Sequence, residues 1–458
     1  MSFRVDAKGL PTHWYNIIGD LPFELPPDIQ PPRSEEATQS GMKMQIPLSL
    51  VRQNTTRQRD IPIPDEVLDH YRAWRTTPLK RALHLEAHLG TTARIYFKYE
   101  GGNASGSHKL STAIAQAHYY KAAGATRLTT GTGAGQWGTA LAIGCRAFGM
   151  DCRVYMVGSS YRAKPYRRTI MQLYGANVLS SPSTQTHFGS RLAASGMDSG
   201  NIAFAVTEAL EDAHANEGSQ LSVGSGENYS ILHSTVIGIE ARQQLLELGH
   251  PPDIVVASLG AGSNFGGIAF PFLGERLRGE RNVRCVSVEP QACPKLTRGV
   301  YRYDYTDGSG VTPLQKMYTL GHQFKPAGMH AGGLRYHACS KLISALYHHK
   351  QIDAVAYAQR DVFESAVLFS QLEGILPAPE SAHAVHGAIQ EAIRAREEGR
   401  SPTILFCLSG HGMFDLAAYA EYLDGSMENV EVSEEEIQRS RSLLPDIDES
   451  QAVAQELS

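Results

Sequence analysis

The sequence lacks three features that would indicate a particular class of protein: closely spaced cysteine pairs, long apolar runs and an excess of basic residues. Its six cysteines are scattered without a Cys-x-x-Cys pair, which indicates free thiols in a reducing compartment. No apolar stretch approaches the about 20 residues that a membrane helix needs, so no membrane span is predicted. Lys and Arg number 42 against 47 Asp and Glu, and this formal net charge of −5 argues against nucleic-acid binding.

The N-terminus also lacks the signature of a secretory signal. Its first residues, MSFRVDAKGLPTHWYN, contain no apolar core followed by a small-residue cleavage site, which predicts a cytoplasmic protein. The chain does have length and an ordinary globular composition. Its 458 residues exceed the size at which one hydrophobic core stops growing, so two or more packed units are expected.

Short apolar runs alternate with helical patterns through most of the chain. Strands are expected at 94–100, 126–130, 152–157, 177–179, 202–206, 253–259, 283–288 and 403–408, and helices at 65–74, 107–122, 134–148 and 164–174. Such alternation implies parallel sheets covered by helices on both faces, so we predict an α/β fold with two sheets. The chain is predicted to have four parts. They are an irregular proline-rich arm at 1–60, an N-terminal α/β domain at 61–225 that exchanges elements with the next domain, a C-terminal α/β domain at 226–425, and an acidic tail with a short helix at 426–458.

Three loops that follow predicted strands have unusual residues, and open α/β sheets bind ligands at such strand ends. In the first loop, Lys109 lies in the first turn of a helix of small residues. The positive end of the helix dipole favours loss of the lysine's proton, which suits Schiff-base chemistry. A solvated surface lysine is the alternative, because most lysines are exposed.

The other two loops are rich in glycine. Backbone N–H groups at 131–138 can hold a carboxylate or phosphate, and no acidic residue follows the next strand to support a nicotinamide cofactor. The loop at 259–264 indicates a phosphate cradle formed by the N–H groups of Gly260 to Asn264 and the Ser263 hydroxyl. A reactive lysine, a carboxylate site and a phosphate cradle together predict pyridoxal phosphate and an amino acid as ligands.

No metal site is predicted from the histidines. His84 and His88 share a helical face, but Glu86 is misplaced for a zinc-binding pattern, so a solvated helix is the better interpretation. Ser409 follows the strand at 403–408, and without a ligand to contact it is interpreted as a turn serine.

Nine short blocks, spread from residue 13 to residue 412, occur together in one known family. They are HWYNI at 13–17, RTTPL at 75–79, YEG through GSHK at 99–109, TGAGQWG at 132–138, KPYRR at 164–168, GSN at 262–264, HAGGLRY at 330–336, EGILPA at 373–378 and LSGHG at 408–412. Over nearly the whole chain, the sequence resembles the tryptophan synthase beta chains of the longer, second type. The resemblance implies a fold type II pyridoxal-phosphate enzyme, with the cofactor between two domains, and a homodimer. It leaves open a monovalent cation and whether an alpha-type subunit docks.

The resemblance also implies roles for individual residues. Lys109 would bind the cofactor as a Schiff base, His108 would approach the phosphate, and the phosphate loop would be Gly260, Ala261, Gly262, Ser263 and Asn264. Ser409 would bond the pyridine nitrogen, with Glu373 close to that edge of the ring. The substrate carboxylate would be held by Thr132, Gly133, Ala134, Gly135 and Gln136. A neutral partner for the ring nitrogen favours loss of a β-substituent to give an aminoacrylate, and Arg335 could receive an anionic leaving group such as phosphate.

One departure from the family pattern lies in the region that would meet the nucleophile. Where the family has a glutamate facing the indole nitrogen, this chain has Gly131, and losing a positioned acid–base group costs about 10²–10⁴-fold for its step. We therefore predict β-replacement on L-serine or an O-activated serine with a nucleophile other than indole, or a bulkier one that fills the space left by glycine. The alternatives are tryptophan synthesis from indole, serine β-elimination by an ammonia lyase, and an inactive binding homologue.

Overall fold

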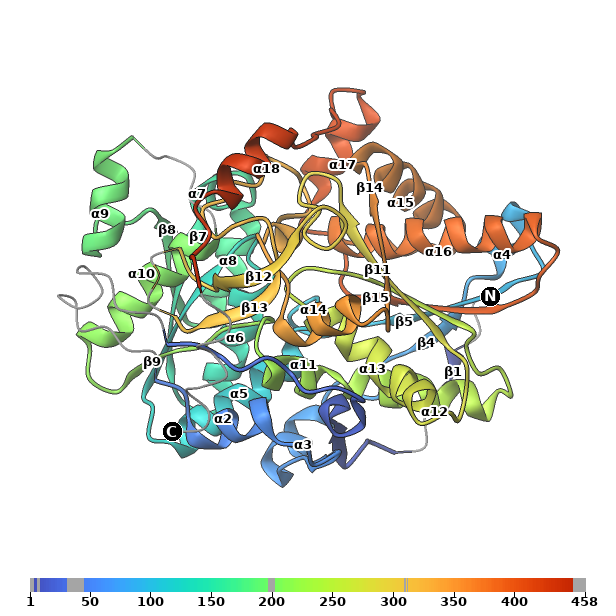
Figure 1. The fold of residues 1–458 in the computed structure, drawn as a ribbon, viewed down its shortest axis with the longest axis horizontal. Coiled ribbons are helices and arrows are strands. Elements are labelled where there is room, and N and C mark those ends of the chain that lie inside the picture. Colours follow the sequence, from blue (N-terminus) through green and yellow to red (C-terminus); the bar gives the residue numbers. More distant parts are fainter. Residues whose placement is uncertain are drawn as a thin grey trace.

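The chain folds around two sheets, the larger at the right of Figure 1 and the smaller at its left. The computed structural model describes residues 4–5, 9–30, 45–196, 202–308, 310 and 312–447. Parts of the predicted arm and the end of the predicted tail therefore lie outside the described residues.

The larger sheet has seven strands in the order β1-β4-β5-β15-β10-β11-β14. Their bounds are Arg4–Val5, Leu79–Arg81, Arg94–Tyr99, Thr403–Leu408, Ile254–Ser258, Arg284–Pro290 and Asp353–Tyr357. The last five strands run parallel, and β4 and β1 continue the sheet in antiparallel pairing. Successive residues of β10 face opposite sides of this sheet. Val255 belongs to the hydrophobic core that includes α13 (Ser263–Leu277), and Val256 belongs to the core that includes α16 (Pro379–Glu397). Because both faces are covered there, the central strands β10 and β15 are buried at every position and mostly apolar.

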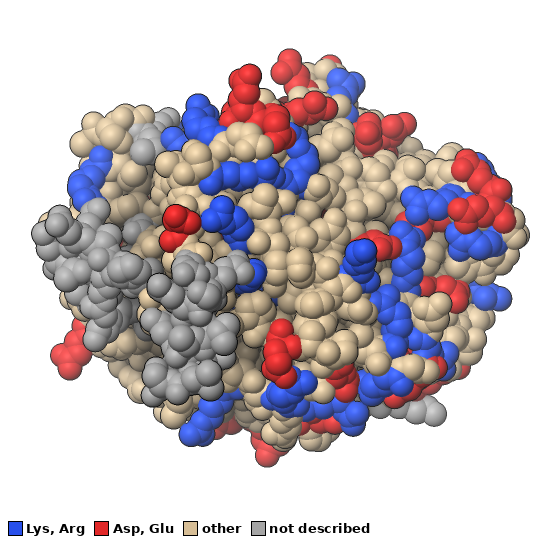
Figure 2. Space-filling view, viewed as in Figure 1, with Lys and Arg blue, Asp and Glu red and all other residues tan. Residues whose placement is uncertain are grey.

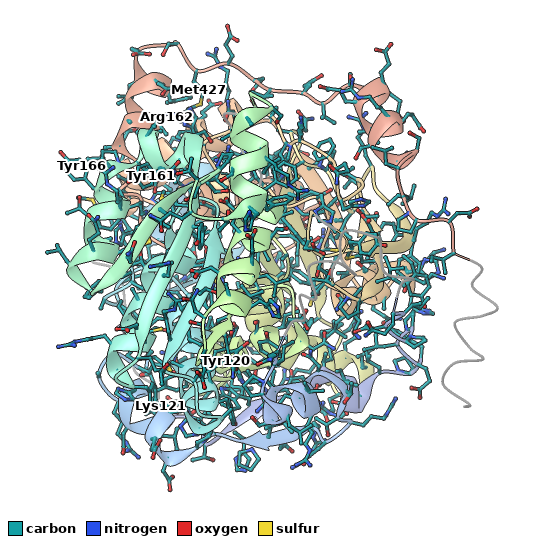
Figure 3. The ribbon with its side chains drawn as sticks, turned by 90° about the vertical axis from the view of Figure 1, so that its left-hand side faces the viewer. Tyr120, Lys121, Tyr161, Arg162, Tyr166 and Met427 are labelled. Carbon is teal, nitrogen blue, oxygen red and sulfur yellow. The ribbon has the colours of Figure 1, made fainter. Side chains whose placement is uncertain are left out.

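The smaller sheet has four parallel strands in the order β8-β7-β6-β9. Their bounds are Ala176–Ser181, Asp151–Val157, Arg127–Thr132 and Ser219–Leu221. One face is covered by α5 (Leu110–Ala122) and α6 (Gln136–Ala147), and the other by α10 (Ile202–Ala215). In Figure 3 this unit faces the viewer, with Tyr161, Arg162 and Tyr166 beyond one end of the strands and Lys121 beyond the other.

The predicted α/β fold with two mostly parallel sheets is confirmed, and one predicted strand is wrong. Residues 202–206 begin helix α10 instead of forming a strand. Their run IAFAV suits a buried strand or a buried helix equally, and the strong helix formers that follow decide for the helix. The strands β4 and β5, although they lie in the range predicted for the N-terminal domain, join the large sheet beside β15.

The described part of the N-terminal arm is more deeply packed than an irregular surface arm would be. Trp14, in β2 (His13–Tyr15), is fully buried in the main core, and β2 pairs with β3 (Asp60–Pro62). Helix α2 (Leu48–Thr55) contacts α11 (Asn228–Ser234), which begins just after the smaller sheet ends. The arm therefore supports the centre of the molecule.

A two-stranded hairpin and further helices complete the fold. The hairpin joins β12 (Val300–Tyr305) to β13 (Leu314–Thr319). The other helices are η1 (Ile17–Asp20), α3 (Asp65–Tyr71), α4 (Leu83–Leu89), α7 (Gly158–Ala163), α8 (Pro165–Leu173), α9 (His187–Ala194), α12 (Val236–Glu247), η2 (Gly332–Leu334), α14 (Lys341–His348), α15 (Gln359–Glu373), α17 (Leu416–Leu423) and α18 (Glu434–Arg441). Among the residues described, no helix is long and apolar enough to cross a membrane. On the face seen in Figure 2, acidic and basic side chains interleave around a broad uncharged area.

Candidate active site

Two cavities meet beside Lys109, where loops leave the carboxyl ends of β5, β6, β10 and β15. The first, which we call the cradle cavity, has a volume of about 440 Å³ including its open mouth and is lined by the loop Gly260–Asn264, His108 and Ser409. The second, which we call the apolar cavity, encloses about 960 Å³ including its open mouth. Five residues line both cavities: Lys109, Gln136, Ser225, Ala261 and Gly333.

The cradle is the loop between β10 and the fifteen-residue helix α13. Gly262 has φ +148°, which favours glycine, and a Cβ at Gly260 would lie 2.7 Å from the Gly333 carbonyl oxygen. The backbone N–H groups at the start of α13 have no partner within their own helix, which suits a phosphate. His108 Nε2 lies 3.1 Å from Ser263 Oγ, so the predicted His108 and phosphate loop do lie together.

Lys109 lies at the N-cap of α5, at the junction of the two cavities. Burial lowers the pKa of its amine to about 8, with Glu380 opposing the change and Arg167 adding to it. No hydrogen bond to Nζ is formed by the residues that the structure describes. About one-tenth of this amine is therefore unprotonated at pH 7, far more than for an ordinary lysine, and the lone pair of that form is free to attack a carbonyl carbon.

The structure corrects the predicted carboxylate of the cradle. Glu373 ends α15 elsewhere, where it accepts a hydrogen bond from the Leu85 backbone N–H at 3.0 Å. Glu380, in the first turn of α16, lines the cradle cavity instead. Its Oε1 accepts hydrogen bonds from Gln136 Nε2 at 2.9 Å and from Gly333 N at 2.8 Å. Glu380 thereby ties the loop after β6 to the segment beside the phosphate cradle.

Ser409 lines the cradle cavity, and its hydroxyl contacts a neutral side chain. Its Oγ is 2.8 Å from Ser381 Oγ, and its carbonyl oxygen accepts a hydrogen bond from the His108 backbone N–H at 2.8 Å. A hydroxyl held in this way can donate a hydrogen bond to, or accept one from, a heterocyclic nitrogen.

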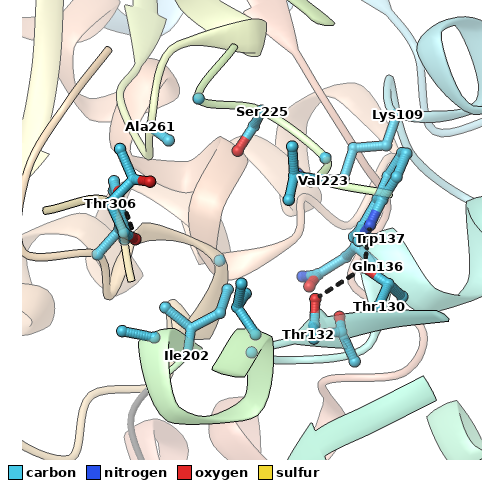
Figure 4. Close-up of a pocket in the computed structure, with 18 of the residues that line it drawn as sticks. Lys109, Thr130, Thr132, Gln136, Trp137, Ile202, Val223, Ser225, Ala261 and Thr306 are labelled. Atoms are coloured by element: carbon cyan, nitrogen blue, oxygen red, sulfur yellow. Dashed lines mark hydrogen bonds between the residues drawn. The ribbon is translucent and has the colours of Figure 1, made fainter. Parts of the chain in front are cut away.

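The apolar cavity is built from segments far apart in the sequence. Figure 4 shows Lys109 and Trp137 at one side, Thr306 of the hairpin at the other and Ile202 of α10 below. Trp137 is held by a hydrogen bond from its Nε1 to Thr130 Oγ1 at 2.7 Å. Side chains from α10 and from the stretch around β9 make most of the wall apolar: Ile202, Ala203, Val206, Leu221 and Val223.

The residues predicted to hold a substrate carboxylate fall in this cavity, with one exception. Its lining includes Thr132, Gly133, Ala134 and Gln136. Gly135, at φ +98°, lies behind them, and a Cβ there would be 3.0 Å from Arg167 Cβ. Arg335 also lines the cavity, where its guanidinium donates a hydrogen bond to Ser160 Oγ at 3.0 Å. The apolar cavity therefore offers a cation as well as apolar walls.

Gly131 does not leave the free space that its small size suggests. A Cβ at this position would lie 2.6 Å from Val206 N and 2.7 Å from the Ala205 carbonyl carbon. The backbone of α10 occupies the volume into which any side chain would start to grow. The expectation that a bulkier nucleophile fills space vacated at Gly131 is therefore wrong.

Several residues of the two cavities were not predicted. Glu380 follows the block at 373–378 by two positions, and an acidic residue in a first helical turn after a proline could have marked it. The stretch from Ser225 to Glu227 spans the predicted domain boundary at 225–226, where no motif indicates a site. Thr306 and Thr312 reach the apolar cavity from the hairpin loop, and no local pattern predicts them. Tyr336, which follows η2, lies in the family block at 330–336, but no role is predicted for it.

The cradle suits pyridoxal phosphate. Glycine is required where the loop turns, buried Asn264 Oδ1 and Glu380 Oε2 have no hydrogen-bond partner among the described residues, and a depressed-pKa amine lies between the cavities. The loop would hold the phosphate, Lys109 the aldehyde carbon and Ser409 the ring nitrogen.

Known proteins agree with this fit. The family described as pyridoxal-phosphate dependent enzyme matches residues 71–410. The "Tryptophan synthase beta chain 2" of Aeropyrum pernix is 50% identical over 443 residues, covering 96% of this chain and 98% of that protein. The protein of the same name from Methanosarcina mazei is 48% identical over 425 residues, covering 93% and 96%. A solved fungal L-serine ammonia-lyase from Rhizomucor miehei shares the fold, with TM-score 0.58 and 16% identity over 77% of this chain and 98% of that one. The chain belongs to the pyridoxal-phosphate dependent enzymes and, among them, to the family of tryptophan synthase beta chains of the second type.

Proposed function

We propose that the chain catalyses β-replacement on L-serine or an O-activated serine, with an apolar nucleophile bound in the apolar cavity. One observation carries this proposal: the amine of Lys109 lies where the phosphate cradle opens into a cavity with mostly apolar walls. A reaction that joins a cofactor-bound amino acid to an apolar partner needs this continuity.

Pyridoxal phosphate, when bound, supplies an electron sink for chemistry at the α- and β-carbons of an amino acid. Lys109 would bind the cofactor through its amine and move the proton at the α-carbon. Backbone N–H groups of Gly133 and Ala134, next to the start of α6, would hold the substrate carboxylate. Arg335 would receive an anionic leaving group, because guanidinium forms charge-assisted hydrogen bonds with phosphate.

The nucleophile is proposed to be a molecule other than indole, since Gly131 provides no carboxylate beside the bound acceptor. Tryptophan synthesis from indole is the second candidate, favoured by relatives about half identical that are called tryptophan synthase beta chains. β-Elimination is a weaker candidate, because the walls from Ile202 to Val223 suit an apolar molecule better than an attacking water. An inactive homologue has no use for the buried, low-pKa amine of Lys109.

A homodimer is proposed from the family resemblance alone, which also leaves a monovalent cation open. A cytoplasmic location is proposed from the free cysteines, which fit a reducing compartment. Docking of an alpha-type subunit is left to a direct test by co-elution with a purified alpha chain.

The test uses the purified enzyme with pyridoxal phosphate and either L-serine or O-phospho-L-serine. A panel of nucleophiles, including indole, is offered and the products are identified by mass spectrometry. Efficient addition of a nucleophile other than indole supports the first proposal, and brisk tryptophan formation supports the second. Pyruvate and ammonia as the main products in the presence of every nucleophile would overturn both.

A further inference from the structure

Thr130 joins two walls of the apolar cavity through one hydroxyl group. It lies near the end of β6, is almost fully buried and lines the cavity. Its Oγ1 accepts a hydrogen bond from Trp137 Nε1 at 2.7 Å and donates one to the Ser222 carbonyl oxygen at 2.6 Å. The Gly131 carbonyl oxygen, at 3.3 Å, is a poorer acceptor for the same proton. The proposed chemistry assigns this hydroxyl no role.

The two walls come from segments that are far apart in the sequence. Trp137 belongs to the first turn of α6, and the other wall is the stretch 222–224, which follows β9. A Cβ at Gly224 would lie 2.5 Å from Cδ2 of the Trp137 ring. Glycine at this position therefore allows the tryptophan ring to lie directly against the backbone of the other wall. Figure 4 shows Trp137 and Val223 on the side of the cavity where Lys109 lies.

Only the tryptophan wall depends on the hydroxyl of Thr130. In the wall after β9, Ser222 Oγ donates a hydrogen bond to Gln116 Oε1 at 2.7 Å. Gln116, in α5, also donates from its Nε2 to the Val223 carbonyl oxygen at 3.0 Å, so this wall is held without Thr130. In contrast, Trp137 Nε1 has Thr130 Oγ1 as its one hydrogen-bond partner in the described part of the chain.

Without that hydroxyl, the ring of Trp137 would have one direction in which to move. Its other side packs in the core of the smaller sheet, with residues such as Leu141 and Met171. A buried N–H without a partner costs free energy, so the ring would turn until this group met water or a ligand. The open volume beside the ring is the apolar cavity, and the turned ring would narrow it.

We propose that Thr130 is a positioning residue that keeps the apolar cavity open to a planar two-ring nucleophile, by holding Trp137 against the stretch 222–224. This inference rests on the proposed β-replacement and names the size of nucleophile that the same site accepts. A one-ring nucleophile would still fit beside a turned Trp137, whereas a second fused ring would compete with it for space. Thr130 therefore selects by shape, through Trp137, without itself binding the nucleophile.

The experiment compares indole with pyrrole, which has the same N–H ring and lacks the fused benzene ring. Binding to the cofactor-loaded enzyme without serine is measured by calorimetry, and kcat/KM is measured with serine for each probe. Thr130→Val, which keeps the branched shape and loses the hydroxyl, should lower the affinity and kcat/KM for indole about tenfold and those for pyrrole less than about threefold. Thr130→Ser, which keeps the hydroxyl, should stay within about threefold of the wild type for both probes.

Thr129→Val is the matched control, because Thr129 is also buried on β6 but lines neither cavity. Its Oγ1 likewise donates to a backbone carbonyl oxygen, that of Ala209, at 2.7 Å. This variant should leave the ratio of the two probes unchanged. Trp137→Phe removes the N–H that Thr130 holds, so adding Thr130→Val to it should change the ratio less than about twofold further.

Three results would overturn the inference: equal losses for both probes in Thr130→Val, a further change of the ratio when it is added to Trp137→Phe, or a wild type that binds neither probe. If Thr130→Val does not fold, Thr130→Cys makes the same comparison, because a thiol is a weak acceptor. The change in the cofactor's absorption on adding serine alone tests the proposed function separately. If that change is absent, the proposed β-replacement fails, while the calorimetry still decides the role of Thr130.

Discussion

The cradle cavity and the apolar cavity share Lys109 but differ in how they are built. Most of the cradle comes from three short stretches at or just after strand ends, 107–109, 258–264 and 409–410, and residues such as Gln136, Gly333 and Glu380 complete it. The apolar cavity draws on α10, the stretch around β9, the hairpin loop and the segment after η2. A cofactor of constant shape can be bound by compact local motifs, whereas an acceptor pocket is assembled by tertiary packing. The identity of the nucleophile is therefore encoded in the less local of the two regions.

The carboxylates of the two cavities show the same contrast. Glu380 in the cradle is bonded to Gln136 and Gly333, which belong to the site itself. Glu227 in the apolar cavity is bonded to Asn54, from the N-terminal arm. The arm thus reaches the lining of the apolar cavity through Asn54.

Replacing the shared residue should disable both cavities at once and gives the largest expected effect. Lys109→Ala should lower kcat for any product at least about 10³-fold, because the amine that binds the cofactor and moves the α-proton is lost. The visible band of the lysine-bound cofactor should disappear, and borohydride reduction of the wild type should label Lys109 in peptide maps. Lys121→Ala, at the exposed end of the same helix, is the control and should keep activity (Figure 3). A pyridoxyl label on another lysine would refute the assignment.

The contrast between the cavities explains which features could be predicted from sequence. The local sequence predicts Lys109 and the loop Gly260–Asn264, because each belongs to a stretch of small residues that follows an apolar strand. The roles of His108 and Ser409 are implied only by the family resemblance. The family block predicts Glu373 beside the cofactor, but Glu380 lines the cradle cavity instead. A family block locates a functional carboxylate only to within a few positions, because tertiary packing decides which side chain faces the cavity. Glu227 has no local signature, since what matters is a contact with Asn54, 173 positions away along the chain.

The same reasoning applies to the fold. Periodicity alone cannot separate a short apolar run from a buried helix segment, and the β-branched and aromatic residues of TILFCL favour the strand there. The run at 202–206 was misassigned because a helix buried against a sheet has the same local composition. The burial of Trp14 and the pairing of β4 with β5 depend on contacts between distant segments and had no local pattern.

Changing Gly131 should test whether the apolar cavity tolerates a side chain on β6. Gly131→Ala should lower the free energy of unfolding by about 1–3 kcal/mol, because the new methyl group meets the backbone of α10 at Ala205 and Val206. Gly131→Glu should be more destabilised and should not gain tryptophan synthesis. Denaturant unfolding is the measurement, and Gly102→Ala, whose Cβ would meet only Tyr99 at 3.4 Å, should be almost neutral. A stable Gly131→Glu enzyme with increased tryptophan formation would show that α10 can move aside.

Arg335 allows the leaving-group function of the apolar cavity to be separated from its acceptor function. Arg335→Leu should lower kcat/KM for O-phospho-L-serine about tenfold and that for L-serine less than threefold, because a charge-assisted hydrogen bond to phosphate is lost. Arg335→Lys should restore part of the difference as a point charge. Steady-state kinetics with the two donors at saturating nucleophile provide the ratio. A parallel loss with both donors would assign Arg335 to packing against Ser160 instead.

The smallest expected effect is a displaced pH profile at the junction of the cavities. Lys109 must be unprotonated to bind the cofactor, and its pKa is about 8, so the rate at which the cofactor-free enzyme rebinds pyridoxal phosphate should rise as pH passes through about 8. Glu380 raises the pKa of Lys109 and Arg167 lowers it. Glu380→Gln removes the charge and keeps an acceptor for Gln136 and Gly333, so the midpoint should move to lower pH by about half a unit. Arg167→Gln should move it in the opposite direction. Stopped-flow absorbance across pH 6–10 would measure both midpoints, and two shifts of the same sign would mean that packing, and not charge, controls the lysine.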